Sequence, residues 1–207
     1  MGIFAATLIL GSATFAIAGV PDLQLSQATG PAEACVLYNL PNADGASFDE
    51  AVAVVAFVPV DATIGLTLID GLTAVIPNYP FEDLHLESSD GGLVACPGGT
   101  TADADTDAAG YTQWQTPLAA SGATSSTADL TVVMVNGAAL TSNGGLPIAH
   151  NSADITKDGE VNLSDVIEFA GDFYGGSYVF RSDFAFDGIL NLSDIIKLAQ
   201  GMGAQCP

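Results

Sequence analysis

Short apolar runs separated by Gly, Pro, Asn and Asp make up residues 20–148. Apolar residues alternate with other residues at Ile64, Leu66 and Leu68, which is the period-two pattern of a strand with one buried face. Many short runs with turn residues between them are typical of stacked sheets, so the sequence predicts a mainly β fold with a two-sheet sandwich here. The expected strands are 23–26, 35–40, 51–60, 63–70, 81–88, 93–96, 111–115 and 129–136, and a short helical turn is expected to open the segment 48–55.

The pattern changes after residue 149, where a twelve-residue segment occurs twice, at 154–165 and again 29 residues later at 183–194. Apolar residues three and four positions apart follow each copy, which predicts one amphipathic helix after each. A small α unit is therefore expected over residues 149–207, joined to the β region by a short link at 147–152. The two helices are expected to pack face to face, with most of these residues in the core: Leu163, Val166, Ile167, Ala170 and Phe173 in the first, Leu192, Ile195, Ile196, Ala199 and Met202 in the second.

Both copies fit the loop that coordinates calcium with oxygens from positions 1, 3, 5, 7, 9 and 12 and has Gly at position 6. The first loop would use Asp154, Thr156, Asp158, the carbonyl of Glu160, Asn162 and Asp165. The second would use Asp183, Asp187, the carbonyl of Ile189, Asn191 and Asp194. Its third position is Ala185, which has no side-chain oxygen, so weaker calcium binding is expected there.

The alternative is that these segments are turns without metal, since Asp, Asn and Gly favour turns on their own. Two copies that agree at positions 1, 5, 6, 9, 10, 11 and 12 favour calcium. Val161 and Leu190, at position 8, are expected to pair the two loops.

The doubled loop, with Asp165 and Asp194 where an ordinary EF-hand has Glu, resembles a dockerin-type module, in which each calcium loop leads into one helix. The resemblance covers about residues 151–205 and implies a small α EF-hand pair. It also implies a cohesin-like protein as partner, met by a surface that includes Leu163, Ser164, Leu192 and Ser193.

A second resemblance concerns residues 55–140. The order of a strand ending in Asp70, a crossover containing Pro77, and the turn Thr106-Asp-Ala-Ala-Gly before a strand is similar to bacterial immunoglobulin-like domains of the invasin type. It implies an immunoglobulin-like β-sandwich over residues 20–148, with an adhesive or spacer role and no catalysis.

Charge narrows the classes of partner. The chain has 24 acidic residues and three basic ones, for a net charge of −21, and the basic residues Lys157, Arg181 and Lys197 all lie in the C-terminal unit. Nucleic acids and anionic membranes are excluded as partners, because binding to phosphates requires Lys and Arg. Divalent cations are expected to stabilise the molecule, because its carboxylates have so few basic partners.

Three cysteines, Cys35, Cys96 and Cys206, leave one thiol over if one disulfide forms, as is usual in a secreted protein. All three pairings stay open. The remaining thiol is either buried and inert or available to a neighbouring subunit. In the second case a spare Cys206 would favour assembly.

Residues 1–19 are uncharged and end in a small-x-small pattern, as in a secretory signal peptide. They are either cleaved or retained as an apolar segment that a neighbouring subunit buries; strand donation of this kind builds filaments by head-to-tail contact. The small polar stretch 121–127 is expected to be an exposed loop that could carry O-linked sugar, which would make the chain a glycoprotein.

Function is expected to be structural and non-catalytic. His85 and His150 have no partner at a catalytic spacing, and Trp114, the only tryptophan, is expected in the core. The leading hypothesis is a secreted bacterial subunit, stabilised by two calcium ions, that self-associates into an extracellular filament or surface layer. The alternative hypothesis is a module that docks onto a cohesin-like receptor on a cell surface or multiprotein complex.

Overall fold

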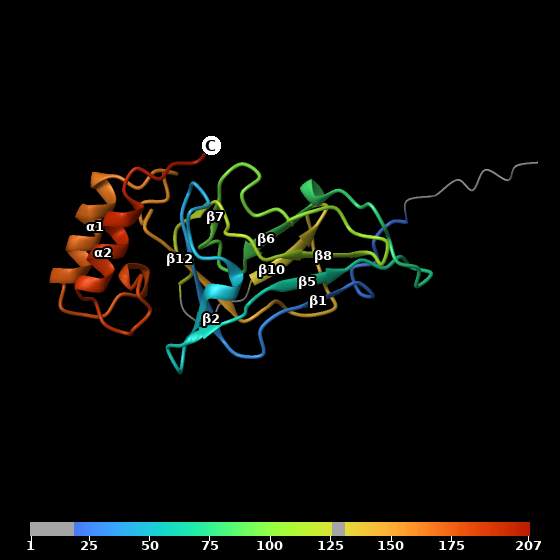
Figure 1. The fold of residues 1–207 in the computed structure, drawn as a ribbon, viewed down its shortest axis with the longest axis horizontal. Coiled ribbons are helices and arrows are strands. Elements are labelled where there is room, and N and C mark those ends of the chain that lie inside the picture. Colours follow the sequence, from blue (N-terminus) through green and yellow to red (C-terminus); the bar gives the residue numbers. More distant parts are fainter. Residues whose placement is uncertain (1–18, 126–130) are drawn as a thin grey trace, which may run out of the picture.

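The computed structural model describes residues 19–125 and 131–207. The signal-peptide or assembly segment therefore lies outside the described residues except for Gly19, as do 126–127 of the predicted loop and 129–130 of the last predicted strand. The described chain is mainly β, with several small sheets and two short α-helices. Figure 1 shows the helices at one end of the long axis, whereas the first described residues lie at the other.

The strands within the described residues are β1 Gln27–Thr29, β2 Cys35–Asn39, β3 Ala51–Ala53, β4 Pro59–Val60, β5 Ile64–Thr67, β6 Leu84–Ser88, β7 Val94–Ala95, β8 Tyr111–Trp114, β9 Ala120–Ser121, β10 Thr131–Val135, β11 Ala138–Ala139 and β12 Ile148–Ser152. The helices are α1 Leu163–Tyr174 and α2 Leu192–Gly201, with 3-10 turns η1 Phe48–Glu50, η2 Phe81–Asp83 and η3 Phe180–Ser182. The predicted helical turn at residue 48 is thus confirmed, and the predicted segment 51–60 is two strands, β3 and β4.

The strands form sheets in the orders β1-β5-β8, β11-β10-β6, β12-β2-β3-β4 and β7-β9. All pairs within them are antiparallel except β12 with β2, which is parallel with Ile148 opposite Cys35 and Ser152 opposite Asn39. One expected strand is wrong: residues 23–26 form a turn, because the Asp22 carboxylate accepts hydrogen bonds from the backbone N–H groups of Gln24 and Leu25 at 2.9 and 3.1 Å.

The predicted link at 147–152 is also wrong for most of its length. Ile148–Ser152 is strand β12, which is buried throughout and paired with β2. The chain therefore passes from a buried strand at the edge of this sheet into the first loop with only Ala153 between them, so the position of the loop is set directly by the sheet.

Two hydrophobic cores lie on opposite sides of β2, because successive side chains of a strand point to opposite faces. Cys35 and Leu37 belong to the larger core, which also holds the fully buried Trp114, as predicted. Val36 and Tyr38 belong to the second core, where they pack with residues of α1, α2 and the second loop. Burial on both sides explains why β2 is a continuous apolar run, and it fixes the helical end to the β region.

The disulfide joins Cys96 to Cys206 and leaves Cys35 as a buried free cysteine. This is one of the three pairings that the sequence left open. The suggestion that Cys206 is free for a neighbouring subunit is wrong, because Cys206 ties the end of the chain to the segment after β7. Burial, with a smaller contribution from Glu33, raises the pKa of the Cys35 thiol to about 12, which disfavours the reactive thiolate at neutral pH.

The predicted exposed loop at 121–127 is wrong for most of its described part, although Ser125 is exposed. Ser121, Gly122 and Thr124 are buried. Gly122 lies too close to its surroundings for any larger residue, since a Cβ there would be 2.5 Å from the Gly92 carbonyl oxygen, and its φ of 79° is in the left-handed region. Thr124 ties this stretch to β12, because its N–H and its hydroxyl donate to the His150 carbonyl at 3.0 and 3.3 Å.

Candidate metal centre

The first loop follows β12 and begins at Asp154, which is fully buried. Its Oδ1 accepts a hydrogen bond from the Lys157 N–H at 2.8 Å, and its Oδ2 accepts one from the Gly159 N–H at 2.7 Å. Gly159 has a φ of 86°, which explains the glycine at loop position 6. One inward-facing carboxylate therefore organises the turn of the loop.

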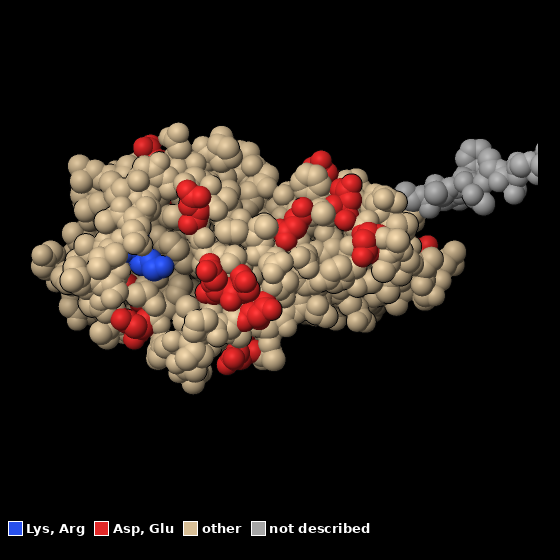
Figure 2. Space-filling model, viewed as in Figure 1, with Lys and Arg blue, Asp and Glu red and all other residues tan. Residues whose placement is uncertain are grey.

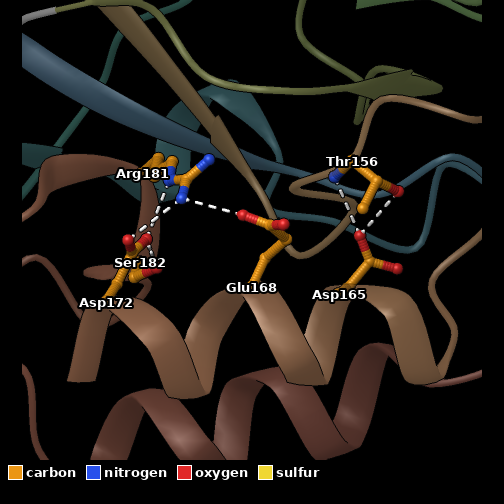
Figure 3. A network of polar contacts seen from close by, with 6 residues as sticks. All are labelled: Thr156, Asp165, Glu168, Asp172, Arg181 and Ser182. Atoms are coloured by element: carbon orange, nitrogen blue, oxygen red, sulfur yellow. Dashed lines mark hydrogen bonds and ion pairs between the residues drawn. The ribbon is translucent and has the colours of Figure 1, made fainter. Parts of the chain in front are cut away.

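Asp165 closes the loop from the first turn of α1 (Figure 3). Its Oδ1 accepts from the backbone N–H and the hydroxyl of Thr156 at 2.9 and 3.0 Å, and its Oδ2 accepts from the Asn162 N–H at 2.8 Å. The Thr156 hydroxyl is also 3.3 Å from Asp154 Oδ1. Loop positions 1, 3 and 12 are thus brought together, while Asn162 caps α1 by accepting from the Ser164 N–H at 2.8 Å.

The remaining predicted ligands of the first loop lie nearer to solvent. Asp158 is exposed and accepts from the Glu160 N–H at 3.1 Å. The backbone on either side of Glu160 pairs with the C-terminal segment: the Cys206 N–H donates to the Gly159 carbonyl at 2.8 Å, and the Val161 N–H donates to the Ala204 carbonyl at 2.8 Å. The disulfide therefore also holds the rim of this loop.

Val161 does not follow the prediction that it pairs with Leu190. Its backbone N–H and carbonyl both bond to the segment after α2, at Ala204 and Gly203. The pairing of Val161 with residues 203–204 could not be predicted from the sequence, because the C-terminal residues have no hydrophobic pattern typical of a strand.

The second loop repeats the arrangement. Asp183 Oδ2 accepts from the Gly188 N–H at 3.0 Å. Asp194 Oδ1 accepts from the Phe184 and Ala185 N–H groups at 2.8 and 2.9 Å, and its Oδ2 accepts from the Asn191 N–H at 2.8 Å. Asn191 caps α2 through the Ser193 N–H at 2.6 Å.

Two side-chain contacts occur in the second loop without a described counterpart in the first. The Tyr178 hydroxyl donates to Asp183 Oδ2 at 3.0 Å, and the Asn191 amide donates to Asp187 Oδ2 at 2.8 Å. Ile189, whose carbonyl is the predicted position-7 ligand, is an exposed residue between Asp187 and Asn191.

Charge in the loops is buried without basic partners. Asp154, Asp165, Asp183 and Asp194 are at most 1% exposed, and the ion pairs among the described residues involve none of them. Burial of a carboxylate costs several kcal/mol unless an opposite charge compensates. Backbone N–H groups of the loops meet part of this cost.

The pKa of Asp183 is raised above its usual value by this burial. Burial raises it, and the nearby charge of Asp194 adds to the effect, while hydrogen bonds from Tyr178 and Gly188 oppose it. Burial and the charge of Asp183 also raise the pKa of Tyr178, so its phenol stays protonated and remains a donor.

Arg181, at the middle of η3, holds α1 to the second loop (Figure 3) and was missed by the sequence analysis. Its Nε donates to Asp172 Oδ2 at 2.8 Å, and one Nη donates to Glu168 at 3.0 Å. Partial burial acts to raise the pKa of Asp172, but the hydrogen bonds from Arg181 and Ser182 and the charge of Arg181 hold it below its usual value. The sequence did contain one indication of this role: Arg181 is the single arginine of a chain with 24 acidic residues, so an ion pair at Arg181 could have been expected.

The apolar stripes of the helices form the core only in part: Val166 and Phe173 are partly buried and pack against the second core. Leu163, Ile167 and Leu192 are about two thirds exposed, at 66, 65 and 66%. The buried residues are instead Asp165 and Phe169 in α1 and Asp194, Leu198 and Gly201 in α2. Leu163, Ser164, Leu192 and Ser193 are thus exposed, as the predicted partner surface requires.

Within the described residues, no three side chains of His, Cys, Asp or Glu come close enough to hold a metal ion by themselves. A calcium loop also uses Thr, Asn and backbone carbonyl oxygens, and the Thr156 hydroxyl is the group that joins the two buried carboxylates of the first loop. The donor set is therefore one of hard oxygens, which suits calcium and not a transition metal.

Outside the two loops, the remaining features are the surface charge and the length of the helices. Figure 2 shows acidic side chains spread along the visible face, with the basic atoms seen there lying over the end that carries the helices. In the described part of the chain, no helix has both the length and the apolar character needed to cross a bilayer.

No protein-family model matches this chain and no curated protein matches it, so the dockerin-type and invasin-type resemblances rest on its own residues alone.

Proposed function

We propose that this protein is a secreted, non-catalytic structural subunit whose two loops bind calcium and which self-associates into an extracellular filament or surface layer. The observation that carries the calcium part is the set of four buried carboxylates without a basic partner. In the finer description of the fold that goes with this proposal, the β region is an immunoglobulin-like sandwich and the helical end is a dockerin-like EF-hand pair.

The first loop would hold its ion with Asp154, Thr156, Asp158, the Glu160 carbonyl, Asn162 and Asp165. The second would use Asp183, Asp187, the Ile189 carbonyl, Asn191 and Asp194, and would bind more weakly because Ala185 gives no oxygen. Calcium supplies positive charge at each loop, and the chain's own groups orient the oxygens through the backbone hydrogen bonds described above.

Self-association is supported by what each end of the molecule presents. Large apolar side chains are exposed on both helices, including Leu163, Ile167 and Leu192, and such side chains in number are typical of contact surfaces. The uncharged residues 1–19 precede the part of the chain that lies at the opposite end (Figure 1). Head-to-tail contact between the two ends builds a filament where the rotation between neighbouring subunits does not close a ring. An apolar contact of this kind needs no basic residues.

Electron microscopy of the purified protein, with calcium and with a chelator, tests this proposal. Polymers that loosen when calcium is removed are expected. Ile167→Glu is expected to reduce polymer formation, whereas Glu87→Gln, on an exposed residue of β6 that is not part of either helix, is expected to leave it unchanged. N-terminal sequencing of secreted protein shows whether residues 1–19 are retained.

A second candidate function is docking onto a cohesin-like receptor. It is favoured by the exposure of Leu163, Ser164, Leu192 and Ser193 at matching places in the two repeats. A monodisperse protein that binds a purified cohesin domain, and loses this binding on Leu163→Glu, would support docking and contradict self-association.

A further inference from the structure

We propose that the disulfide between Cys96 and Cys206 sets the calcium affinity of the first loop, because it holds a short C-terminal strap that turns the Glu160 carbonyl into the loop. The strap is residues 203–206. This inference rests on the proposed calcium-binding role of the loops, and it adds two positioning residues that belong to neither loop.

The strap pairs with positions 6 to 8 of the first loop. The Cys206 N–H donates to the Gly159 carbonyl at 2.8 Å. Val161 accepts from the Gly203 N–H at 2.9 Å and donates its own N–H to the Ala204 carbonyl at 2.8 Å. Both neighbours of loop position 7 are therefore bonded to the strap.

This pairing fixes the direction of position 7. Glu160 lies opposite Gln205 in an antiparallel bridge, and the hydrogen bonds run through its neighbours, so its own N–H and carbonyl point away from the strap. In extended backbone these two groups of one residue lie on the same side. The Glu160 N–H donates to Asp158 Oδ1, within the loop, at 3.1 Å. The Glu160 carbonyl, the predicted position-7 ligand, is therefore turned to the loop as well.

The disulfide is the main anchor of the strap. Ala204 is its one buried residue, and a chain end with so little burial is poorly ordered unless it is tied down. Cys96 is 2% exposed, and its backbone N–H and carbonyl are bonded to Ala119 and Gly99 at 3.0 and 2.8 Å. The covalent bond thus fixes the strap, and with it the carbonyl of position 7, to the β region.

The second loop has no such strap within the described residues. The Ile189 N–H donates to Asp187 Oδ1 at 3.1 Å, as its counterpart does in the first loop. In the same part of the chain, however, the Gly188 carbonyl and the Leu190 N–H make no backbone hydrogen bond to another segment. The second loop is therefore an internal control, whose affinity does not depend on the disulfide.

The test is calorimetric titration of the full chain with calcium, with and without the paired change Cys96→Ser and Cys206→Ser. Asp183→Asn, which removes a carboxylate of the second loop, isolates the first, and Asp154→Asn isolates the second. Loss of the disulfide is expected to weaken calcium binding at the first loop on the order of tenfold, as loss of a group that orients a ligand does. The second loop is expected to change by less than about threefold.

Val133→Ala is the matched control for a general loss of stability. Val133 belongs to the larger core, which contains no residue of either loop. This variant is expected to leave the calcium affinity of both loops within about threefold of the unaltered chain.

A second variant keeps the disulfide, because removal of a disulfide can prevent folding. Gly203→Pro deletes the N–H that bonds to Val161, and proline cannot adopt the φ of 84° found here. Gly203 is exposed, and Met202 before it has a ψ of 129°, which is compatible with a following proline. The first loop is expected to bind calcium about tenfold more weakly in this variant as well.

The unaltered chain gives a third readout, because coupling between two sites is reciprocal. Dithiothreitol supplies two electrons and two protons, converts the disulfide to two thiols and is itself oxidised to a cyclic disulfide. The ratio of reduced to oxidised dithiothreitol that half-reduces the protein is expected to be about tenfold higher in saturating calcium than in chelator.

The inference is overturned if the first loop binds calcium equally well with and without the disulfide, if both loops weaken together, or if Val133→Ala weakens the first loop as much. A chain in which neither loop binds calcium, with the disulfide intact, would instead overturn the calcium role itself. The two failures are therefore distinguishable.

Discussion

The fully buried His150 in β12 makes the stability of the protein depend on pH. Thr131 donates its hydroxyl to the Ile148 carbonyl at 2.7 Å, so it accepts from His150 Nε2–H at 2.8 Å, and Nδ1 is left to accept from the Asn39 amide at 3.1 Å. Both ring nitrogens are satisfied in the neutral form. A proton on Nδ1 would face the Asn39 N–H instead.

Burial lowers the pKa of His150 from 6.5 to about 4, against a smaller opposing effect from Asp90. The unfolded chain therefore binds more protons than the folded one between these values, and stability falls as pH decreases through this window. The full shift corresponds to about 3 kcal/mol, of which about 2 kcal/mol is lost between pH 7 and pH 5. This is a large part of the 5–15 kcal/mol by which domains are typically stable.

Urea unfolding at saturating calcium, followed by the fluorescence of Trp114, measures this loss. Trp114 is fully buried in the larger core, so its emission reports global unfolding. His150→Gln is expected to be less stable at pH 7 but to lose about 2 kcal/mol less than the unaltered chain between pH 7 and pH 5.

The reasoning is refuted if both proteins have the same pH slope. That result would mean that Asn39 turns its amide over, so that its Oδ1, which is buried without a described partner, accepts a proton from Nδ1 and removes the cost of charging the ring.

Three further predictions concern the helical end and the free thiol. Arg181→Met leaves Asp172 without its basic partner and is expected to lower stability by about 1–2 kcal/mol, measured by thermal unfolding; Lys197→Met, which removes an exposed charge, should cost less than about 1 kcal/mol. Calcium at about 1 mM is expected to stabilise the protein by about 2.7 kcal/mol for each site with a dissociation constant of about 10 μM, and Asp154→Asn should remove one such contribution. Cys35 is expected to react with a thiol reagent only in denaturant, and a fast reaction of the native protein would contradict its burial.

The loops could be predicted from the sequence because their chemistry is local. Asp154 and Asp165 lie within one short segment, and the turn at Gly159 follows from the residues around it. The disulfide could not be predicted, because the choice between Cys35 and Cys206 as partner of Cys96 depends on which strands come together in space.

Strand β12 was missed for a different reason. His150, Asn151 and Ser152 are polar, and a hydrophobicity pattern treats polar residues as exposed, yet all three are at most 1% exposed. Their polar groups are largely met by other buried groups: the Asn151 amide donates to the Phe180 and Asp183 carbonyls at 2.7 and 3.0 Å. Such pairing across distant segments leaves no mark on the local sequence.

In the helices, the hydrogen bonds of the preceding loop, and not the apolar spacing, determine which face is buried. Loop position 12 lies in the first turn of each helix, so Asp165 must point inwards to accept the hydrogen bonds of its loop, and Phe169, four residues later, lies on the same face. Leu163 and Ile167 are also four residues apart, but Leu163 precedes Asp165 by two, which places this pair on the opposite face. The loop therefore sets the rotation of the helix, so that Phe169 packs inwards while Leu163 and Ile167 stay outside. Exposed apolar side chains in number are typical of contact surfaces, which is what the proposed self-association requires of Leu163 and Ile167.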